Sequence, residues 1–207
     1  MTKILKIHPK NPEKRLIAQA ITILQQKEAV MVYPTDSAYA LGCKIGDKDA
    51  QERICNIRNI EKTHNFTLIC RNLAEISQYA EVNNIVFRLL KAHTPGPYTF
   101  VLPATKEVPK RLQHTKRKTI GLRIPQNNIT MSLLEDMGTP LMSVTLILPN
   151  EEFPMADPEE ISVKLNNRVD LIIDGGFCGL EPTSVIEFSD NIPKVIRKGK
   201  GDISSFL

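Results

Sequence analysis

Short apolar runs rich in β-forming residues alternate with amphipathic segments along most of the 207-residue chain. The runs are too short for helices, whereas the segments between them repeat apolar residues at helical spacing. Alternation of this kind predicts an α/β fold. Several runs follow one another without a helix between them, so the sheet is predicted to be mixed, with parallel and antiparallel neighbours. Strands are predicted at 29–34, from Tyr39, and at 66–70, 98–102, 119–124, 140–145, 171–174, 184–188 and 194–197, and helices at 11–27, 47–57, 73–79, 83–92, 127–137 and 157–165.

The first helix carries the clearest start signal. Asn11 is predicted as its N-cap, and Pro12 then stands in the first turn, where its missing N–H costs nothing. Leu16, Ala20 and Ile23 belong to one apolar stripe along this helix.

Length and composition predict one ordinary globular domain spanning residues 1–207. Four cysteines form no CxxC pair and no Cys/His zinc pattern, so they are predicted to be reduced, mostly buried thiols, and no protein-bound metal is expected. The N-terminal residues lack a secretory apolar region, and no apolar stretch approaches the roughly 20 residues that span a bilayer. A cytoplasmic protein without membrane contact is expected.

Polar residues interrupt the strands at three places, where they would face a ligand crevice. The first is Pro34-Thr35-Asp36-Ser37, which is also typical of a simple turn. In the second, 119–125, alternation places Thr119, Gly121 and Arg123 on one face. Arg123 then either forms an internal salt bridge or binds a carboxylate or phosphate ligand.

The third interruption places Ser143 and Thr145 on a shared strand face. Thr183 and Arg197 begin and end further short strands and are weak signals alone. The stretch 148–158 is the longest predicted surface loop, and such a loop can act as a lid.

Seven Lys and Arg residues stand between 106 and 123 against one acid, Glu107. This basic stretch is either a solvated face or a phosphate track on double-stranded RNA or tRNA, with Lys110, Arg111, Lys116, Arg117 and Lys118 as candidate contacts. The 11 aromatic residues (7 Phe, 4 Tyr) offer little for stacking single-stranded bases. No Walker A or Rossmann phosphate loop occurs.

The order of these clusters resembles the YrdC family of threonylcarbamoyl-adenylate synthases. Four motifs carry the resemblance over about residues 15–200: 34–42 (PTDSAYALG), 94–102 (TPGPYTFVL), 119–125 (TIGLRIP) and 195–199 (VIRKG). Within the family the chain is most similar to the YciO branch.

The resemblance implies a twisted mixed sheet around a deep, positively lined cavity. It also implies condensation of L-threonine, bicarbonate and ATP, accompanied by magnesium, to threonylcarbamoyl-AMP and pyrophosphate, for tRNA modification. By position, Thr35, Arg123, Ser143 and Thr183 are expected in the threonine pocket. Arg58, Thr119, Thr145 and Arg197 are expected along ATP. No covalent nucleophile is required.

The sequence departs from the family pattern at three places, the first of which is a phosphate-binding pair. Arg58-Asn59-Ile60 replaces a Lys-x-Arg pair, so one cation is lost, with Lys62 as a candidate substitute. Thr145-Leu146-Ile147 replaces Ser-x-Asn, and Cys70 stands where a His is frequent.

These departures leave three hypotheses open. The chain is a threonylcarbamoyl-AMP synthase of reduced activity, or a non-catalytic binder of double-stranded RNA, tRNA or a ribosomal element, or an enzyme that adenylates another small carboxylate.

Overall fold

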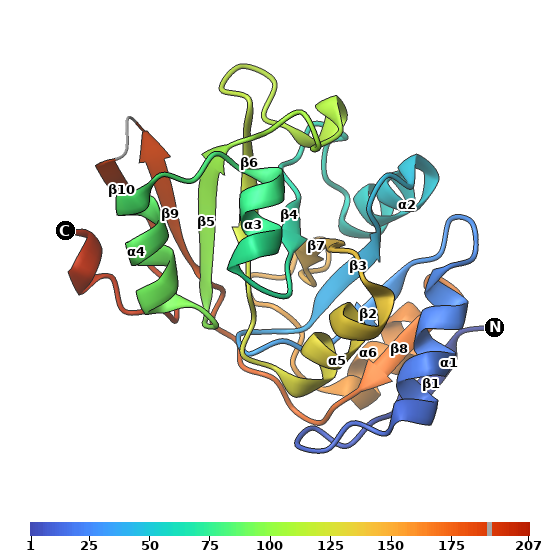
Figure 1. The fold of residues 1–207 in the computed structure, drawn as a ribbon. Coiled ribbons are helices and arrows are strands. Elements are labelled where there is room, and N and C mark those ends of the chain that lie inside the picture. The colour runs from blue at the N-terminus through green and yellow to red at the C-terminus, as the bar shows by residue number, and fades with distance from the viewer. Residues whose placement is uncertain (190–191) are drawn as a thin grey trace.

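The computed structural model describes residues 1–189 and 192–207, and within them ten strands form one sheet in the order β1-β8-β2-β3-β7-β4-β6-β5-β9-β10 (Figure 1). The strands are β1 (Lys3–Lys6), β2 (Met31–Tyr33), β3 (Ala40–Lys44), β4 (Thr67–Ile69), β5 (Tyr98–Pro103), β6 (Thr119–Arg123), β7 (Leu141–Thr145), β8 (Leu171–Asp174), β9 (Ser184–Ser189) and β10 (Ile192–Arg197). The helices are α1 (Lys14–Leu24), α2 (Lys48–Arg58), α3 (Leu73–Tyr79), α4 (Asn84–His93), α5 (Asn128–Met137) and α6 (Pro158–Leu165), with 3₁₀ turns η1 (Lys110–Leu112) and η2 (Ser204–Phe206).

The sheet is mixed, as the alternation predicts. β8 runs parallel to both β1 and β2, and parallel pairs also join β4 to β6 and β5 to β9. The other neighbours are antiparallel. The α/β fold with a mixed sheet is therefore confirmed.

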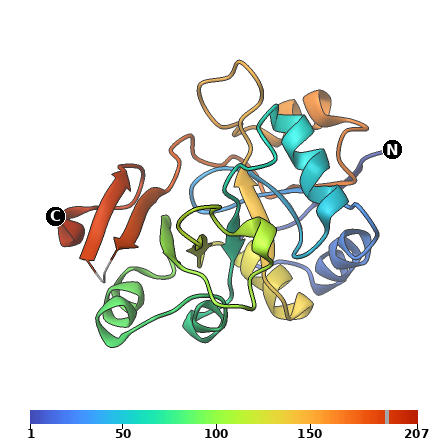
Figure 2. The same ribbon diagram turned by 90° about the horizontal axis from the view of Figure 1, so that it is seen from above.

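Helices cover the two faces of the sheet unequally. Figure 2 shows α1, α3, α4 and α5 along one face and α2 and α6 on the other. Under α1 and α5 lies a separate apolar cluster that includes Ile17, Ala20 and Leu133. The face that carries α2 and α6 leaves β5, β6 and β9 without a covering helix (Figure 2), and the candidate functional site lies there.

The predicted helices and strands are confirmed to within a few residues, with two corrections at the N-terminus. Helix α1 begins at Lys14 with Glu13 as N-cap, so Asn11 is not the cap. The His8 ring closes a turn instead, because its Nδ1 accepts the backbone N–H groups of Lys10 at 3.3 Å and Asn11 at 3.1 Å.

Strand β1 was not predicted, because only Leu5 of its four residues is buried. It adds to the sheet edge beside β8, where the backbone ladder rather than an apolar run stabilises it.

All four cysteines are free thiols, as predicted, and Cys43, Cys55 and Cys70 are buried. Burial raises the pKa of the half-buried Cys178 to about 11, so this thiol stays protonated at neutral pH. Among residues 1–189 and 192–207, no helix is long and apolar enough to cross a membrane.

Candidate functional site

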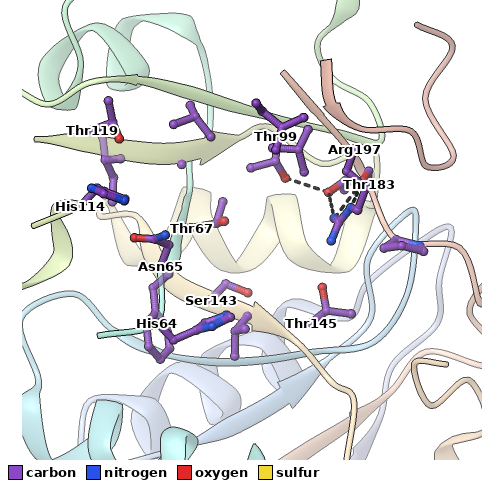
Figure 3. A pocket seen from close by; sticks show the side chains of 18 of the residues that line it. His64, Asn65, Thr67, Thr99, His114, Thr119, Ser143, Thr145, Thr183 and Arg197 are labelled. Carbon is purple, nitrogen blue, oxygen red and sulfur yellow. Dashed lines mark hydrogen bonds between the residues drawn. The ribbon is translucent and has the colours of Figure 1, made fainter. Parts of the chain in front are cut away.

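A pocket of about 400 Å³ opens over β5, β6 and β9, a size within the range of small-molecule sites (Figure 3). Its walls come from the end of α2, the residues before β4, the segment before β6, and the ends of β7 and β10. Three arginines and one carboxylate contribute to the lining: Arg58, Arg117, Arg197 and Glu187.

Strand alternation explains why the polar residues of β6 and β7 reach this pocket, although Ile120 and Val144 border it as well. Thr119 and Gly121 of β6 line it, whereas Leu122 is fully buried on the opposite face. Ser143 and Thr145 of β7 also line it, so both predicted polar strand faces are confirmed. A Cβ on Gly121 would lie 3.1 Å from Thr67 Oγ1, so glycine here keeps the pocket floor open between the strands.

A smaller recess of about 30 Å³ adjoins the pocket, a volume on the scale of one or two water molecules. The recess and the pocket share Thr67, Thr99, Ser143, Val144, Thr145 and Thr183 as lining residues. Ser37 and Arg123 line the recess only. The two spaces therefore form one site with a narrow inner end.

Arg123 is buried at this inner end and forms an ion pair with Asp36. Its Nη2 also donates to Ser37 Oγ at 3.0 Å and to Thr35 Oγ1 at 3.4 Å. Two buried polar atoms of the pair, Arg123 Nε and Asp36 Oδ2, have no hydrogen-bond partner among the described residues. The internal salt bridge exists, and it still leaves Arg123 Nε as an open donor on a residue that lines the recess, whereas Asp36 lines neither space.

Thr35 lies beside this pair but lines neither the pocket nor the recess. Its Oγ1 accepts the N–H groups of Ser37 and Ala38, both at 3.2 Å, and donates to the Ala38 carbonyl at 2.6 Å. The turn interpretation of residues 34–37 is therefore confirmed. The structure places Thr35 behind Arg123 and out of direct reach of the recess.

Thr183 joins the recess to the guanidinium of Arg197 (Figure 3). Arg197 donates to the Thr183 carbonyl from Nε at 3.1 Å and from Nη2 at 2.9 Å, and Nη2 lies 3.3 Å from Thr183 Oγ1. Thr99 Oγ1 lies 2.8 Å from Thr183 Oγ1. Partial burial lowers the pKa of Arg197, but a guanidinium remains protonated in proteins.

Replacing Thr183 by Val is expected to weaken about tenfold the amino-acid binding that the family resemblance implies, while the protein still folds. Valine keeps the shape but removes a hydroxyl that borders both the recess and the pocket, so a ligand there loses a hydrogen bond of about 1–2 kcal/mol. Calorimetric titration with L-threonine measures the change, and Thr183→Ser, which keeps the hydroxyl, is the control. Equal affinity in Thr183→Val and the parent would contradict a role for this hydroxyl.

Ser143 is held by a fully buried tyrosine. Tyr33 OH donates to Ser143 Oγ at 2.6 Å, and Ser143 Oγ donates to the Leu41 carbonyl at 3.3 Å. Burial raises the pKa of Tyr33 to about 12, so it remains a donor at neutral pH. The Ser143 hydroxyl is therefore fixed in orientation at the boundary between recess and pocket.

Arg58 and Lys62 are separated by the fold. Arg58 lines the pocket and its Nε donates to the Ile147 carbonyl at 3.1 Å, while burial lowers its pKa. Lys62 is exposed, pairs with Glu52 Oε2 at 3.0 Å and does not line the pocket. Ile60 packs against the main apolar core. The geometry gives no support to Lys62 as a substitute for a missing phosphate-binding cation.

The basic stretch is not a uniform solvent-facing track. Arg111 donates to Gln51 Oε1 at 3.4 Å and to the Gly46 carbonyl, and Arg117 pairs with Glu187 in the pocket wall. Lys110, Lys116 and Lys118 are exposed. RNA binding by this stretch stays a prediction that would depend on these lysines.

The loop 148–158 is anchored at one end. Met155 is buried, its N–H donates to the Leu146 carbonyl at 3.0 Å, and residues 149–153 are exposed. The loop follows Ile147, a lining residue, so it begins at the pocket rim. A lid role stays a prediction.

Several residues that line the pocket were not predicted from the sequence. Thr67 and Thr99 stand on strands, and the same alternation that selects Thr119 could have selected them. His64, Asn65 and His114 come from irregular segments, as Figure 3 shows, and no sequence pattern marks them. Burial, together with nearby Arg58, lowers the pKa of His64, so this ring is neutral at pH 7.

Comparison with known proteins adds independent information. The Sua5/YciO/YrdC family model, described as telomere recombination, matches residues 23–199. The chain is 56% identical over 207 residues to the uncharacterized protein YciO of Escherichia coli, covering 100% of both chains. It is 27% identical over 188 residues to the threonylcarbamoyl-AMP synthase of Bacillus subtilis, covering 88% of this chain and 53% of that protein.

Solved structures agree with the fold described above. The crystal structure of E. coli YciO superimposes with a TM-score of 0.95 at 55% identity and full coverage of both chains. The structure of P. abyssi Sua5 complexed with L-threonine superimposes with a TM-score of 0.86 at 22% identity, covering 96% of this chain and 58% of that chain.

Proposed function

The chain belongs to the Sua5/YciO/YrdC family, and from this premise we propose that it condenses L-threonine, bicarbonate and ATP to threonylcarbamoyl-AMP with release of pyrophosphate. Relatives at 27% identity in Bacillus subtilis and Methanocaldococcus jannaschii are named as a threonylcarbamoyl-AMP synthase and a putative one. The product would supply the threonylcarbamoyl group for modification of a tRNA adenosine.

The observation that carries this proposal is the unpaired guanidinium donor at the inner end of the site. Arg123 lines the recess and its Nε has no hydrogen-bond partner among the described residues, so it can donate to a ligand carboxylate. An α-amino acid supplies that carboxylate. A buried donor without a partner is rare and costly, so binding an amino acid here would satisfy it.

The recess must widen to take threonine, because about 30 Å³ admits little more than water. Ser143 and Thr183 border both recess and pocket, and their hydroxyls would then lie against the amino acid. The amine would point outward to the pocket, where bicarbonate and ATP must meet it.

The larger pocket has charges suited to a polyphosphate. In the proposed reaction the unprotonated amine nitrogen bonds to the carbon of bicarbonate and water leaves, which gives a carbamate. One carbamate oxygen then bonds to the α-phosphorus of ATP, and the bond from that phosphorus to pyrophosphate breaks. Negative charge builds on the leaving pyrophosphate. Arg58 and Arg197 line the pocket and can stabilise that charge without a covalent intermediate.

Magnesium would enter with the nucleotide. Magnesium sites usually combine one or two carboxylates with phosphate oxygens. Glu187 is the only carboxylate among the described lining residues, and Arg117 already neutralises it. The lining therefore fits a metal that the ATP phosphates hold, not one that protein carboxylates hold.

The proposal is tested by measuring pyrophosphate release from ATP and bicarbonate with each of the twenty amino acids in turn. We expect release that depends on L-threonine and on bicarbonate. Equal release with many amino acids would contradict selectivity for threonine. Release with another small carboxylate in place of threonine would identify that carboxylate as the substrate. No release above the amino-acid-free control would contradict synthase activity and favour a binding protein.

Introducing an amide at position 147 is expected to strengthen ATP binding. Ile147 lines the pocket and its carbonyl accepts from Arg58, so Ile147→Asn would add a donor beside the phosphate-binding cation. A hydrogen bond to a charged group contributes about 1.5–3 kcal/mol, which is roughly ten- to a hundredfold in affinity. ATP titration calorimetry measures the change, with Ile147→Val as the apolar control. A folded Ile147→Asn protein with unchanged ATP affinity would contradict this placement of the phosphates.

A further inference from the structure

Glu187 is a carboxylate in a pocket whose other charged lining residues are arginines. It lies on β9, its side chain is 7% exposed, and it lines the pocket beside Val185. Lys194 lies opposite it in the β9–β10 register, yet within the described residues only Arg117 forms an ion pair with it. A carboxylate buried this far depends strongly on its single counter-charge.

Arg117, in contrast, reaches the pocket from an exposed segment and is not fully engaged. Its side chain is 53% exposed, and Nη1 donates to Glu187 Oε1. In the part of the chain that the structure describes, the remaining guanidinium donors have no partner. The backbone is fixed by His114, whose Nδ1 accepts the N–H groups of Lys116 at 3.2 Å and Arg117 at 3.1 Å.

This arrangement places a guanidinium with free donors in the pocket wall. Arginine binds phosphate through two parallel N–H groups. A carboxylate that accepts from one edge of the guanidinium leaves its remaining N–H groups available. The same carboxylate also repels an anionic ligand and competes for Arg117. The two residues therefore oppose each other in their effect on any polyphosphate.

We propose that Arg117 is a polyphosphate-binding residue of this pocket and that Glu187 holds it in place while limiting how tightly polyphosphate binds. The inference rests on the proposed nucleotide site. It adds to that site a cation from the segment before β6, whereas Arg58 comes from α2. It also gives pyrophosphate release a physical basis, because the ion pair between Glu187 and Arg117 can form again as the product leaves.

The test is a double-mutant cycle with inorganic tripolyphosphate as the probe. Calorimetry at fixed ionic strength compares the parent with Arg117→Ala, Glu187→Gln and the double variant. We expect about ten- to a hundredfold weaker binding in Arg117→Ala and about tenfold tighter binding in Glu187→Gln. The double variant should bind as weakly as Arg117→Ala, because the gain from Glu187→Gln requires Arg117.

The double variant and one control variant keep the result interpretable. Arg117→Ala leaves Glu187 buried without its counter-charge and can fail to fold, whereas the double variant removes that buried charge and remains testable. Arg88→Ala, an exposed arginine on α4 that does not line the pocket, is the matched control and should bind like the parent.

The inference is overturned if Glu187→Gln binds more tightly and the double variant keeps that gain, because Arg117 would then be only a structural counter-ion. A parent that binds no tripolyphosphate overturns it as well. Tripolyphosphate binding that is lost with Arg117, in a protein without threonine-dependent pyrophosphate release, would support the inference and contradict the proposed reaction. Pyrophosphate release that Arg117→Ala and the double variant leave unchanged would contradict the inference alone.

Discussion

Replacing Arg123 by Ala is expected to abolish L-threonine binding, with at least a hundredfold loss of affinity. The guanidinium is the only cation that lines the recess among the described residues, and its Nε is the donor left open for a ligand carboxylate. The same change leaves Asp36 largely buried without its counter-charge. The free energy of unfolding should therefore fall by about 3–5 kcal/mol.

A second variant separates these two effects. Arg123→Ala combined with Asp36→Asn removes the buried charge, so most of the lost stability should return while threonine binding stays absent. Calorimetric titration with threonine and denaturant unfolding measure both quantities. Threonine binding by the folded double variant at the parent's affinity would contradict the assignment of Arg123 as the carboxylate-binding residue.

Replacing Arg197 by Ala is expected to lower threonine-dependent pyrophosphate release by about 10²–10³-fold, the usual effect of removing one donor that stabilises developing negative charge. Arg197 binds the Thr183 carbonyl through two N–H groups, so its guanidinium is oriented before any ligand arrives. Because Arg197 is only partly buried, at the pocket edge, the loss of stability should be small.

Arg197→Lys tests the geometry behind this expectation. Lysine keeps the charge but cannot donate through a planar fork, so activity between those of the parent and the alanine variant is expected. Steady-state pyrophosphate release at saturating threonine measures the series, with Arg88→Ala as the control. Parent-like rates in Arg197→Ala would place the transferring phosphates elsewhere in the pocket.

The period-two pattern of strands is the part of the site that sequence could predict. Thr119, Gly121 and Arg123 share a face because successive strand residues point to opposite sides, and Ser143 and Thr145 follow the same rule. The family motifs then group these strands around one cavity. Both inferences need only local geometry or a known fold.

Partnerships between distant residues could not be predicted in this way. Arg117 and Glu187 are 70 residues apart, and only the folded sheet brings them together. The pairing of Lys62 with Glu52 likewise depends on how the chain turns after α2. Among local features, the predicted N-cap of α1 was wrong. Asn11 donates its backbone N–H to the His8 ring in the preceding turn, and the helix begins later with Glu13 as its N-cap.

The most direct measurement of the proposed reaction follows the carbon of bicarbonate. The protein is incubated with ATP, magnesium, L-threonine and ¹³C-bicarbonate, and the nucleotide products are separated and weighed by mass spectrometry. The account predicts an adenylate that carries both threonine and the labelled carbon, formed in equal amount to pyrophosphate and lost in Arg123→Ala. An absence of labelled adenylate while the protein is folded, or an adenylate without the labelled carbon, would contradict it.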